Sequence, residues 1–264
     1  MSTCEMICNT NRTRGKDSDA NFNACMQAHI ATAKADDAAL VTRAGAELQV
    51  PHLLRATQGT TVRLIALLRN PTNRLYAAFW HYPHYRGKFG ASVSGFLKYH
   101  REMAGHLSAC VQAHGLDACA LKFESLERRF ERVFYHVDQH FKGVYVPYVR
   151  RWSQTFSPGW RTCLLFLRTE DYVANTRDTL ARVLSFAGLS APDEAWWKRT
   201  LAEPVRHNGA PRKWSSFPPL PTEARQEVDA FFRPYNEELA ALLGDEAFLW
   251  AGPSEPPHHL GAVR

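Results

Sequence analysis

The sequence predicts an α/β fold in which a parallel sheet is flanked by helices. Two apolar runs have the composition of buried strands, "VRLIALLRN" (62–70) and "RTCLLFLRTEDY" (161–172), and both end in charged residues. Near-continuous apolar runs are typical of parallel strands that are covered on both faces. Segments with helical periodicity lie between and after the two runs, and this alternation favours an α/β architecture.

Proline, glycine and apolar periodicity place the predicted helices. Pro71 cannot continue a strand ladder but suits the first turn of a helix, so the first strand should pass at Asn70–Pro71 into a helix that runs to Pro83. Apolar residues at three- and four-residue steps predict further helices. These are residues 94–115, 121–152, 176–188 and 222–244, with a short helix at 50–57. The last of the long segments is either a helix pair or one helix interrupted at Pro234.

The length and composition are those of a globular protein with one sizeable core. The chain has 264 residues, of which 45% are hydrophobic and 22% are charged, a balance typical of folded domains. The patterned segments lie in residues 46–250, which we assign to one domain. Residues 1–45 are polar and then Ala-rich with weak periodicity, and residues 251–264 have the Pro-rich composition of a flexible tail.

The charge distribution predicts an anionic ligand. A net charge of +6 and a pI near 9.1 are spread along the chain and not gathered in one tail, which indicates a basic surface patch. Nucleotides, sulfated or carboxylated glycans and nucleic acids all meet that requirement. A nucleoside-phosphate kinase is disfavoured because the sequence has no Walker-type lysine loop.

The sequence shows neither a membrane segment nor a metal-ligand pattern. No stretch approaches the roughly 20 continuous apolar residues of a membrane-spanning helix, and the first thirty residues are too polar for a signal peptide. As written, the chain is expected to be soluble and to carry no readable address. The six cysteines and twelve histidines lack the repeated short spacings of metal ligands, so we expect no metal site.

Cys110 and Cys119 are the most suggestive pair of cysteines. Both lie in "SACVQAHGLDACALKF" (108–123), where a helix end, a turn at Gly115 and a return of the chain can bring them within bridging distance. A disulfide there would indicate an oxidising compartment. Two buried free thiols fit the same residues equally well, and both alternatives remain open.

A fixed positive charge follows the first predicted strand. Arg69 lies at the carboxyl end of that strand, and the next helix begins at once. Ligands bind at this edge of open parallel sheets, and a guanidinium beside the free backbone N–H groups of a helix N-terminus suits a phosphate. The alternative is that Arg69 pairs with a nearby carboxylate at the sheet edge.

Five segments in order resemble the sulfotransferases that use 3′-phosphoadenosine 5′-phosphosulfate (PAPS). "LIALLRNPTNRLYAAF" (64–79) is similar to their phosphate-binding segment, in which a strand ends in Arg-Asn/Asp-Pro and a second arginine follows. The resemblance extends over roughly residues 45–250 and is greatest to Golgi carbohydrate sulfotransferases of the N-acetylgalactosamine 4-sulfate 6-O-sulfotransferase type. The other matching segments are "KGVYVPYVRRW" (142–152), "CLLFLRTEDY" (163–172), "LARVLSFAGL" (180–189) and "FFRPYNEELAALLGDEAFLW" (231–250).

The resemblance implies a P-loop-NTPase-like fold and assigns roles to individual residues. Arg69 would contact the 3′-phosphate of the donor, and His81 matches a position where related glycan sulfotransferases carry a histidine near the acceptor. The loop "RHNGAPRKWSSFPP" (206–219) falls where the family brings a second basic loop over the nucleotide. Its candidate contacts are Asn208, Gly209, Arg212 and Lys213. For each loop residue the alternative is a solvated side chain, and for His81 it is an ordinary histidine at a helix end.

Other charged residues receive structural roles from the same resemblance. Arg74 is expected to brace its helix through a carboxylate. Glu170 and Asp171 follow a strand, and two adjacent carboxylates there could be interpreted as an acid/base pair. The family pattern favours a structural role for both. The Cys110 and Cys119 pair fits a disulfide of the family, and the resemblance places the protein in the Golgi lumen.

The sequence departs from the family in two places. The family's 5′-phosphosulfate loop, Pro-Lys-x-Gly-Thr-Thr or similar, lies upstream of the matched segments, and residues 1–45 contain no such element. "TQGTT" (57–61) lacks the lysine and precedes a strand, so we interpret it as a turn. Lys34, Asp36 and Asp37 are weak active-site candidates in "AKADDAALVT" (33–42). Ala77 replaces a family serine that bonds the 3′-phosphate, a loss expected to cost roughly 1.5 to 3 kcal/mol of binding free energy.

The sequence therefore predicts a carbohydrate O-sulfotransferase that uses PAPS and a glycan acceptor and needs no metal or nucleic acid. Two explanations fit the missing loop. The chain is a partial product that lacks the first strand, the loop and a membrane anchor, or it is an inactive member that binds a nucleotide or an anionic glycan. We favour the first because the remaining motifs stand in good order, and on this view the fold is incomplete at its N-terminus.

Overall fold

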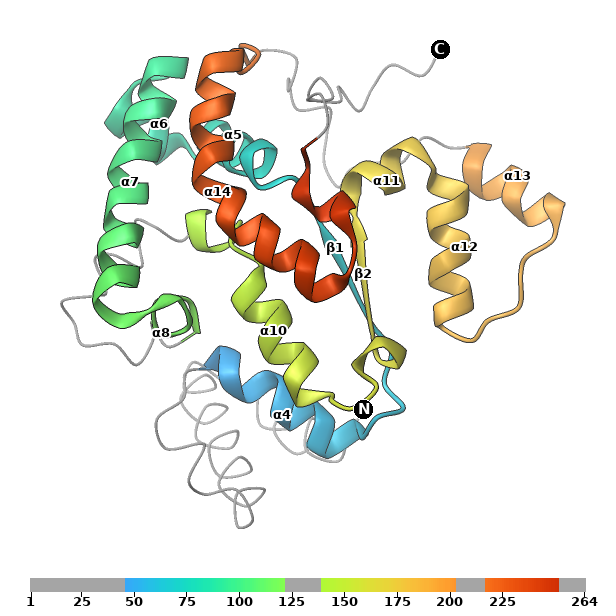
Figure 1. Cartoon of the computed structure of the whole chain (residues 1–264). Helices are drawn as coiled ribbons and strands as arrows, with labels where there is room; N and C mark the ends of the chain where they lie inside the picture. The colour runs from blue at the N-terminus through green and yellow to red at the C-terminus, as the bar shows by residue number, and fades with distance from the viewer. Residues whose placement is uncertain (1–45, 122–138, 203–216, 252–264) are drawn as a thin grey trace, which may run out of the picture.

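The computed structural model describes residues 46–121, 139–202 and 217–251. In this part of the chain a small parallel sheet is flanked by helices (Figure 1), which confirms the predicted α/β class. Strand β1 (Leu64–Leu68) pairs in parallel with strand β2 (Leu164–Arg168), and Leu64 lies opposite Leu164. The two predicted strands are therefore neighbours, and their carboxyl ends lie at the same edge.

The expectation that the first strand is covered on both faces is wrong. Ile65 and Leu67 of β1 are 45% and 49% exposed, whereas Leu64, Ala66 and Leu68 on the opposite face are half-buried. Helices and turns pack against β2, but the main described neighbour of β1 is β2 itself. An apolar run identifies a strand, but it does not report how many layers cover that strand.

The passage from strand to helix at Asn70–Pro71 is confirmed. Helix α5 (Pro71–His81) has Pro71 in its first turn, and the Asn70 side chain caps it by accepting a hydrogen bond from the backbone N–H of Asn73 at 3.0 Å. Helix α6 (Pro83–Phe89) follows directly. Both starts combine a proline in the first turn with a preceding residue outside the helical region, with ψ of 120° at Asn70 and 114° at Tyr82, as the proline ring favours.

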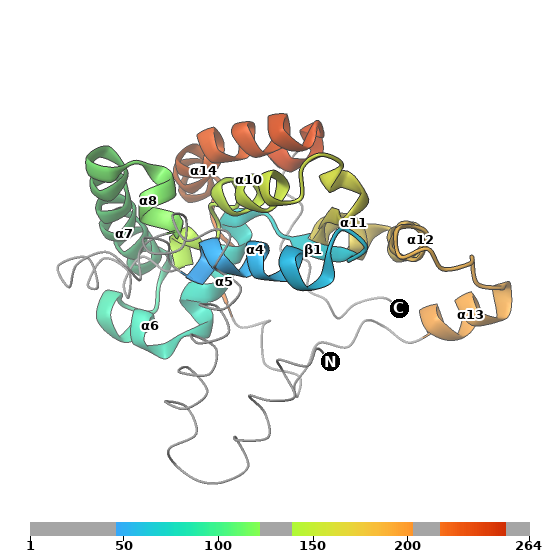
Figure 2. The same ribbon diagram turned by 90° about the horizontal axis from the view of Figure 1, so that it is seen from below.

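Aromatic side chains fill the main core. Helices α5, α6, α7 (Val93–His114) and α14 (Thr222–Leu243) line it on one side of the sheet, whereas α12 (Thr176–Phe186) and α13 (Glu194–Ala202) lie on the other (Figures 1 and 2). Among its fully buried side chains are Phe79, Phe96, Tyr99 and Phe232. These rings pack mostly edge to face, an arrangement that aromatic pairs prefer.

The predicted bridge between Cys110 and Cys119 is present. It joins the end of α7 to α8 (Leu116–Leu121), across a turn at Gly115 whose φ is +80°. This φ lies in the region that glycine adopts most easily. The alternative of two free thiols is therefore wrong, and the described part of the chain leaves Cys163 as a buried free thiol.

The prediction of one helix over residues 121–152 is wrong in its described part. Residues 122–138 lie outside the described residues, and the chain turns at Lys142–Gly143 before α10 (Val146–Thr155) begins. A Cβ on Gly143 would come within 2.9 Å of the Phe232 ring, so this position packs only as glycine. Pro147 then suits the first turn of a new helix.

The remaining elements mostly match the expected pattern. Helix α14 is one helix that continues through Pro234, so neither a helix pair nor an interruption at Pro234 is observed. "TQGTT" forms a turn after α4 with Gly59 at φ +64°. The short helix at 50–57 is part of α4, whereas α13 was not predicted. The other bounds are α4 (Ala46–Gln58), η2 (Trp160–Thr162), α11 (Thr169–Ala174) and η4 (Glu246–Leu249).

Two histidines are enclosed in the core. Nδ1 of His100 on α7 lies 3.1 Å from Nε2 of His140, and both residues are almost fully buried. Burial lowers the pKa of His100 to about 4, against the opposing effect of Glu227. Burial is the main cause that lowers the pKa of His140 well below its usual value, and repulsion by a protonated His100 and by Arg74 adds to the shift. The pair is therefore neutral at pH 7.

This pair predicts a loss of stability on acidification. Between pH 6.5 and about 4 the unfolded chain binds a proton at His100 that the folded chain does not bind, so the free energy of unfolding falls as the pH falls. The expected loss from His100 is on the order of 3 kcal/mol across that window. In His100→Asn, whose amide can still pair with His140, the slope measured by urea unfolding should be shallower. The same change at the exposed His106 of α7 is the control, and equal slopes for both variants would contradict the prediction.

Candidate functional site

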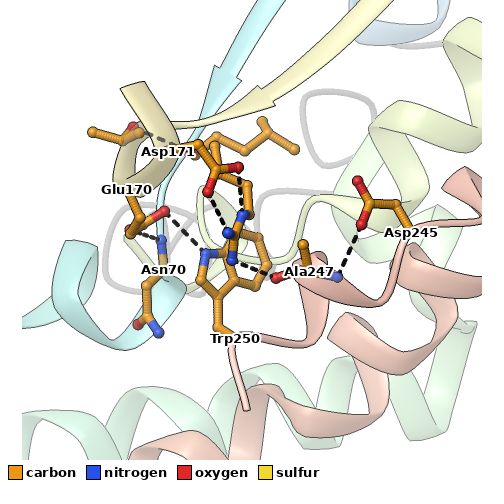
Figure 3. Close-up of polar contacts among 9 residues, drawn as sticks. Asn70, Glu170, Asp171, Asp245, Ala247 and Trp250 are labelled. Atoms are coloured by element: carbon orange, nitrogen blue, oxygen red, sulfur yellow. Dashed lines mark hydrogen bonds and ion pairs between the residues drawn. The ribbon is translucent and has the colours of Figure 1, made fainter. Parts of the chain in front are cut away.

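The carboxyl ends of the two strands form a polar edge of the sheet. Arg69 follows β1, and Glu170 and Asp171 follow β2 in the first turn of α11. Trp250 reaches the same place from the C-terminal end of η4, as Figure 3 shows. This is the edge at which ligands bind in open parallel sheets.

Both polar groups of the peptide that joins Arg69 to Asn70 are hydrogen-bonded by side chains. The backbone N–H of Asn70 donates to Oε1 of Glu170 at 2.8 Å, and the hydroxyl of Tyr145 donates to the carbonyl oxygen of Arg69 at 2.9 Å. Burial is the main cause that raises the pKa of Tyr145, so this hydroxyl remains a donor at neutral pH. The second carboxylate oxygen of Glu170 accepts the indole N–H of Trp250 at 3.1 Å.

The side chain of Arg69 is exposed, and within the described ranges no carboxylate forms an ion pair with it. Partial desolvation lowers the pKa of this guanidinium, while the charge of Glu170 opposes the shift. The described residues therefore do not form the alternative arrangement, in which a carboxylate at the sheet edge neutralises Arg69. A cation in this position remains available to an anion.

The two acidic residues after β2 have structural partners. Asp171 accepts hydrogen bonds from Arg168, one of them from Nε at 2.9 Å, and this interaction raises the pKa of Arg168. Nη1 of Arg168 also donates to the carbonyl oxygen of Ala247 at 2.8 Å, so α11 is connected to η4 (Figure 3). These contacts agree with the structural role that the family pattern favours for Glu170 and Asp171.

Arg74 braces its helix, and its partner among the described residues is Gln139 and not the expected carboxylate. Its guanidinium donates to the backbone carbonyl of Gln139 at 2.9 Å and to the side-chain oxygen of the same residue at 3.1 Å. A planar fork can satisfy two acceptors of one neutral residue as well as the two oxygens of an acid. Arg74 thus braces the helix as predicted, but its partner is the neutral Gln139.

His81 and Arg69 lie at opposite ends of α5. His81 is the last residue of the helix and is exposed, with its ring edge-on to Tyr82 at 4.7 Å. Because a helix of 11 residues rises about 16 Å, the structure does not bring His81 next to the strand ends.

The remaining candidates lie outside the described residues: Asn208, Gly209, Arg212 and Lys213, and the weaker candidates Lys34, Asp36 and Asp37. The last residues of the basic loop, from 217 on, are described and pack against α5. The Tyr76 hydroxyl donates to the carbonyl oxygen of Pro218 at 2.6 Å, and Trp80 stacks on Phe217 at 5.0 Å.

Two residues of this edge were missed from the sequence. Tyr145 and Trp250 both lie in segments that resemble the sulfotransferases, "KGVYVPYVRRW" and "FFRPYNEELAALLGDEAFLW", but no spacing rule connects either residue to Arg69. A resemblance identified the segments, and only the fold shows which of their side chains reach the strand ends.

Curated proteins with similar sequences are carbohydrate sulfotransferases. Carbohydrate sulfotransferase 15 from Homo sapiens, Mus musculus and Rattus norvegicus are each 27% identical to the chain over 191 residues, which cover 71% of the chain. The chain is a relative of the carbohydrate sulfotransferases. It spans 31% of the length of these curated sulfotransferases. No family model matches the chain.

The described part of the chain has neither of two further features. None of its described helices is both long and apolar enough to span a lipid bilayer. Its described His, Cys, Asp and Glu side chains form no group of three or more that could hold a metal ion.

The double contact of Arg74 predicts a cost for its replacement by lysine. Lysine keeps the charge but cannot donate to both Gln139 acceptors in one plane, so Arg74→Lys should lower the free energy of unfolding by about 1 to 2 kcal/mol. Urea unfolding at neutral pH measures the change. The same substitution at the exposed Arg233 of α14 is the control, and equal stability of the two variants would show that the fork contributes nothing.

Proposed function

We propose that this chain is a carbohydrate O-sulfotransferase, or the part of one, that transfers sulfate from PAPS to a glycan hydroxyl. The observation that carries the proposal is the sequence similarity to carbohydrate sulfotransferases. The resemblance of residues 64–79 to a phosphate-binding segment supports it, because Arg69 lies exposed at the strand ends and forms no ion pair with a described carboxylate. Residues 46–250 are proposed to form the sulfotransferase-like domain. The Golgi lumen is the proposed location, and the Cys110–Cys119 disulfide supports an oxidising compartment.

Arg69 is proposed to bind the 3′-phosphate of the donor. Its guanidinium is permanently charged and can donate two parallel hydrogen bonds to a phosphate. The N-terminus of α5 lies directly beside it, where the helix dipole favours negative charge. Asn208, Gly209, Arg212 and Lys213 are proposed as further nucleotide contacts, and the packing of Phe217 and Pro218 on α5 supports a loop that returns to this helix.

His81 is proposed as the base that takes the proton of the acceptor hydroxyl. In the reaction the acceptor oxygen bonds to sulfur, the bond between sulfur and the 5′-phosphate oxygen breaks, and 3′,5′-ADP leaves with the electron pair. The protein's share of the work is to position both substrates and to neutralise the charge of the leaving group. Because His81 lies at the far end of α5, this role needs a donor that extends along the helix.

A second candidate is a protein of the same fold that binds a nucleotide or an anionic glycan without transferring sulfate. Ala77 favours it, because a serine hydroxyl would stand there in the family pattern. Both candidates bind through Arg69. A nucleic-acid binder is the contrasting class, since it would respond to polyanions with a steep salt dependence.

Removal of Arg69 should abolish most of the affinity for the desulfated donor. Titration calorimetry with 3′,5′-ADP is expected to give a Kd about 10 to 100 times higher for Arg69→Ala than for the native chain, because charge-assisted hydrogen bonds are lost. Arg63→Ala removes an exposed arginine just before β1 begins, at the opposite end of the strand, and should leave the Kd unchanged. Binding of polyanions alone would exclude both candidate functions.

Restoration of the family hydroxyl should strengthen binding. Ala77→Ser on α5 is expected to lower the Kd for 3′,5′-ADP by about tenfold, since it adds one hydrogen bond to a charged phosphate. Ala78→Ser, one residue further along the same helix, is the control, because a shift of one residue points the hydroxyl to a different face. A decrease of equal size in both variants would show that position 77 has no special relation to the phosphate.

A further inference from the structure

We propose that Trp250, Glu170 and Tyr145 are positioning residues that hold Arg69 ready for an anion. The inference rests on the proposed role of Arg69 and concerns how the chain keeps that side chain oriented and unpaired. The three residues come from different parts of the chain, before α10, on α11 and after η4. Tyr145 and Glu170 hydrogen-bond the peptide that joins Arg69 to Asn70, and Trp250 hydrogen-bonds Glu170.

The first step concerns the backbone. A peptide unit is planar, so its C=O and N–H groups turn together when the unit rotates between its two Cα atoms. Here the C=O accepts from Tyr145 and the N–H donates to Glu170. Rotation of the unit would break both hydrogen bonds at once. The backbone from which the Arg69 side chain projects is therefore held by two side chains that belong to other elements.

The second step concerns the carboxylate. Glu170 is near enough to Arg69 for its charge to influence the pKa of the guanidinium, yet its two oxygens are taken by the N–H groups of Asn70 and Trp250. The indole N–H of Trp250 thus holds in place the oxygen that would otherwise be open to Arg69. Loss of that N–H would let Glu170 turn to the guanidinium and neutralise it.

The third step concerns the backbone of Trp250. Its φ is +49°, and it is the only residue other than glycine with a positive φ among the described residues. A bulky side chain rarely adopts this conformation unless its surroundings impose it. The surroundings here are the hydrogen bond to Glu170 and ring contacts with Phe248 at 5.6 Å and Tyr145 at 6.2 Å. Trp250 therefore touches both of the residues that hold the Arg69–Asn70 peptide, as Figure 3 shows for Glu170.

The test compares three variants by calorimetry with 3′,5′-ADP. Trp250→Phe keeps an aromatic ring but removes the N–H donor, and it should raise the Kd by about tenfold because Glu170 then competes for Arg69. In the double variant Glu170→Gln/Trp250→Phe the competing charge is absent while an oxygen remains for Asn70, so most of the affinity should return. Trp196→Phe, on α13 and away from the strand ends, is the control and should bind as the native chain does.

Amide hydrogen exchange at Asn70, followed by NMR, tests the hydrogen bonds without any donor present. Trp250→Phe should speed exchange of this amide severalfold, and Trp196→Phe should not. The positioning role is overturned if Trp250→Phe matches the control in both affinity and exchange, or if its affinity falls and the double variant fails to restore it. Failure of the native chain to bind 3′,5′-ADP would reject the proposed function instead, and the exchange rate would still decide whether Trp250 supports the peptide.

Discussion

The parallel pairing of β1 with β2 determines where the other parts of the candidate site lie. The register places Leu68 opposite Arg168, so Arg69 and the start of α11 leave the sheet side by side. The Thr169 hydroxyl secures this junction by donating to the carbonyl oxygen of Leu68 at 3.0 Å. Without the pairing, Glu170 could not reach the N–H of Asn70, a residue 100 positions earlier in the chain.

Helix α14 fixes the other side of α5. Near its start the carboxylate of Asp229 accepts a hydrogen bond from the Thr72 hydroxyl at 2.5 Å, and Arg225 donates to the side-chain oxygen of Asn73 at 2.7 Å. The first turn of α5 is thus held by α14, while the peptide that precedes it is held by Tyr145, just before α10, and by Glu170 of α11. A phosphate bound at this helix start would meet donors whose backbone is already ordered, which reduces the entropy lost on binding.

Local chemistry made part of this arrangement predictable, and long-range contacts made the rest unpredictable. The start of α5 follows from Asn70 and Pro71 alone, because a cap and a first-turn proline act on their immediate neighbours. The partner of Arg74 does not, since Gln139 lies 65 residues away and is neutral. The end of helical structure near Gly143 could not be predicted for the same reason, because the Phe232 ring that excludes a side chain at this position belongs to the distant helix α14. Trp250 shows no signal in the sequence for its contact with Glu170.

The Cys110–Cys119 disulfide and the strand pairing differ in the length of chain that each must close. The disulfide joins residues nine positions apart, whereas the strands pair residues one hundred positions apart. The entropy of loop closure differs between these two lengths by about 2 kcal/mol, and local contacts generally form faster than distant ones. The corner of α7 and α8 can therefore form within a short piece of the chain during synthesis. The site of Arg69 can be completed only after Trp250 has been made.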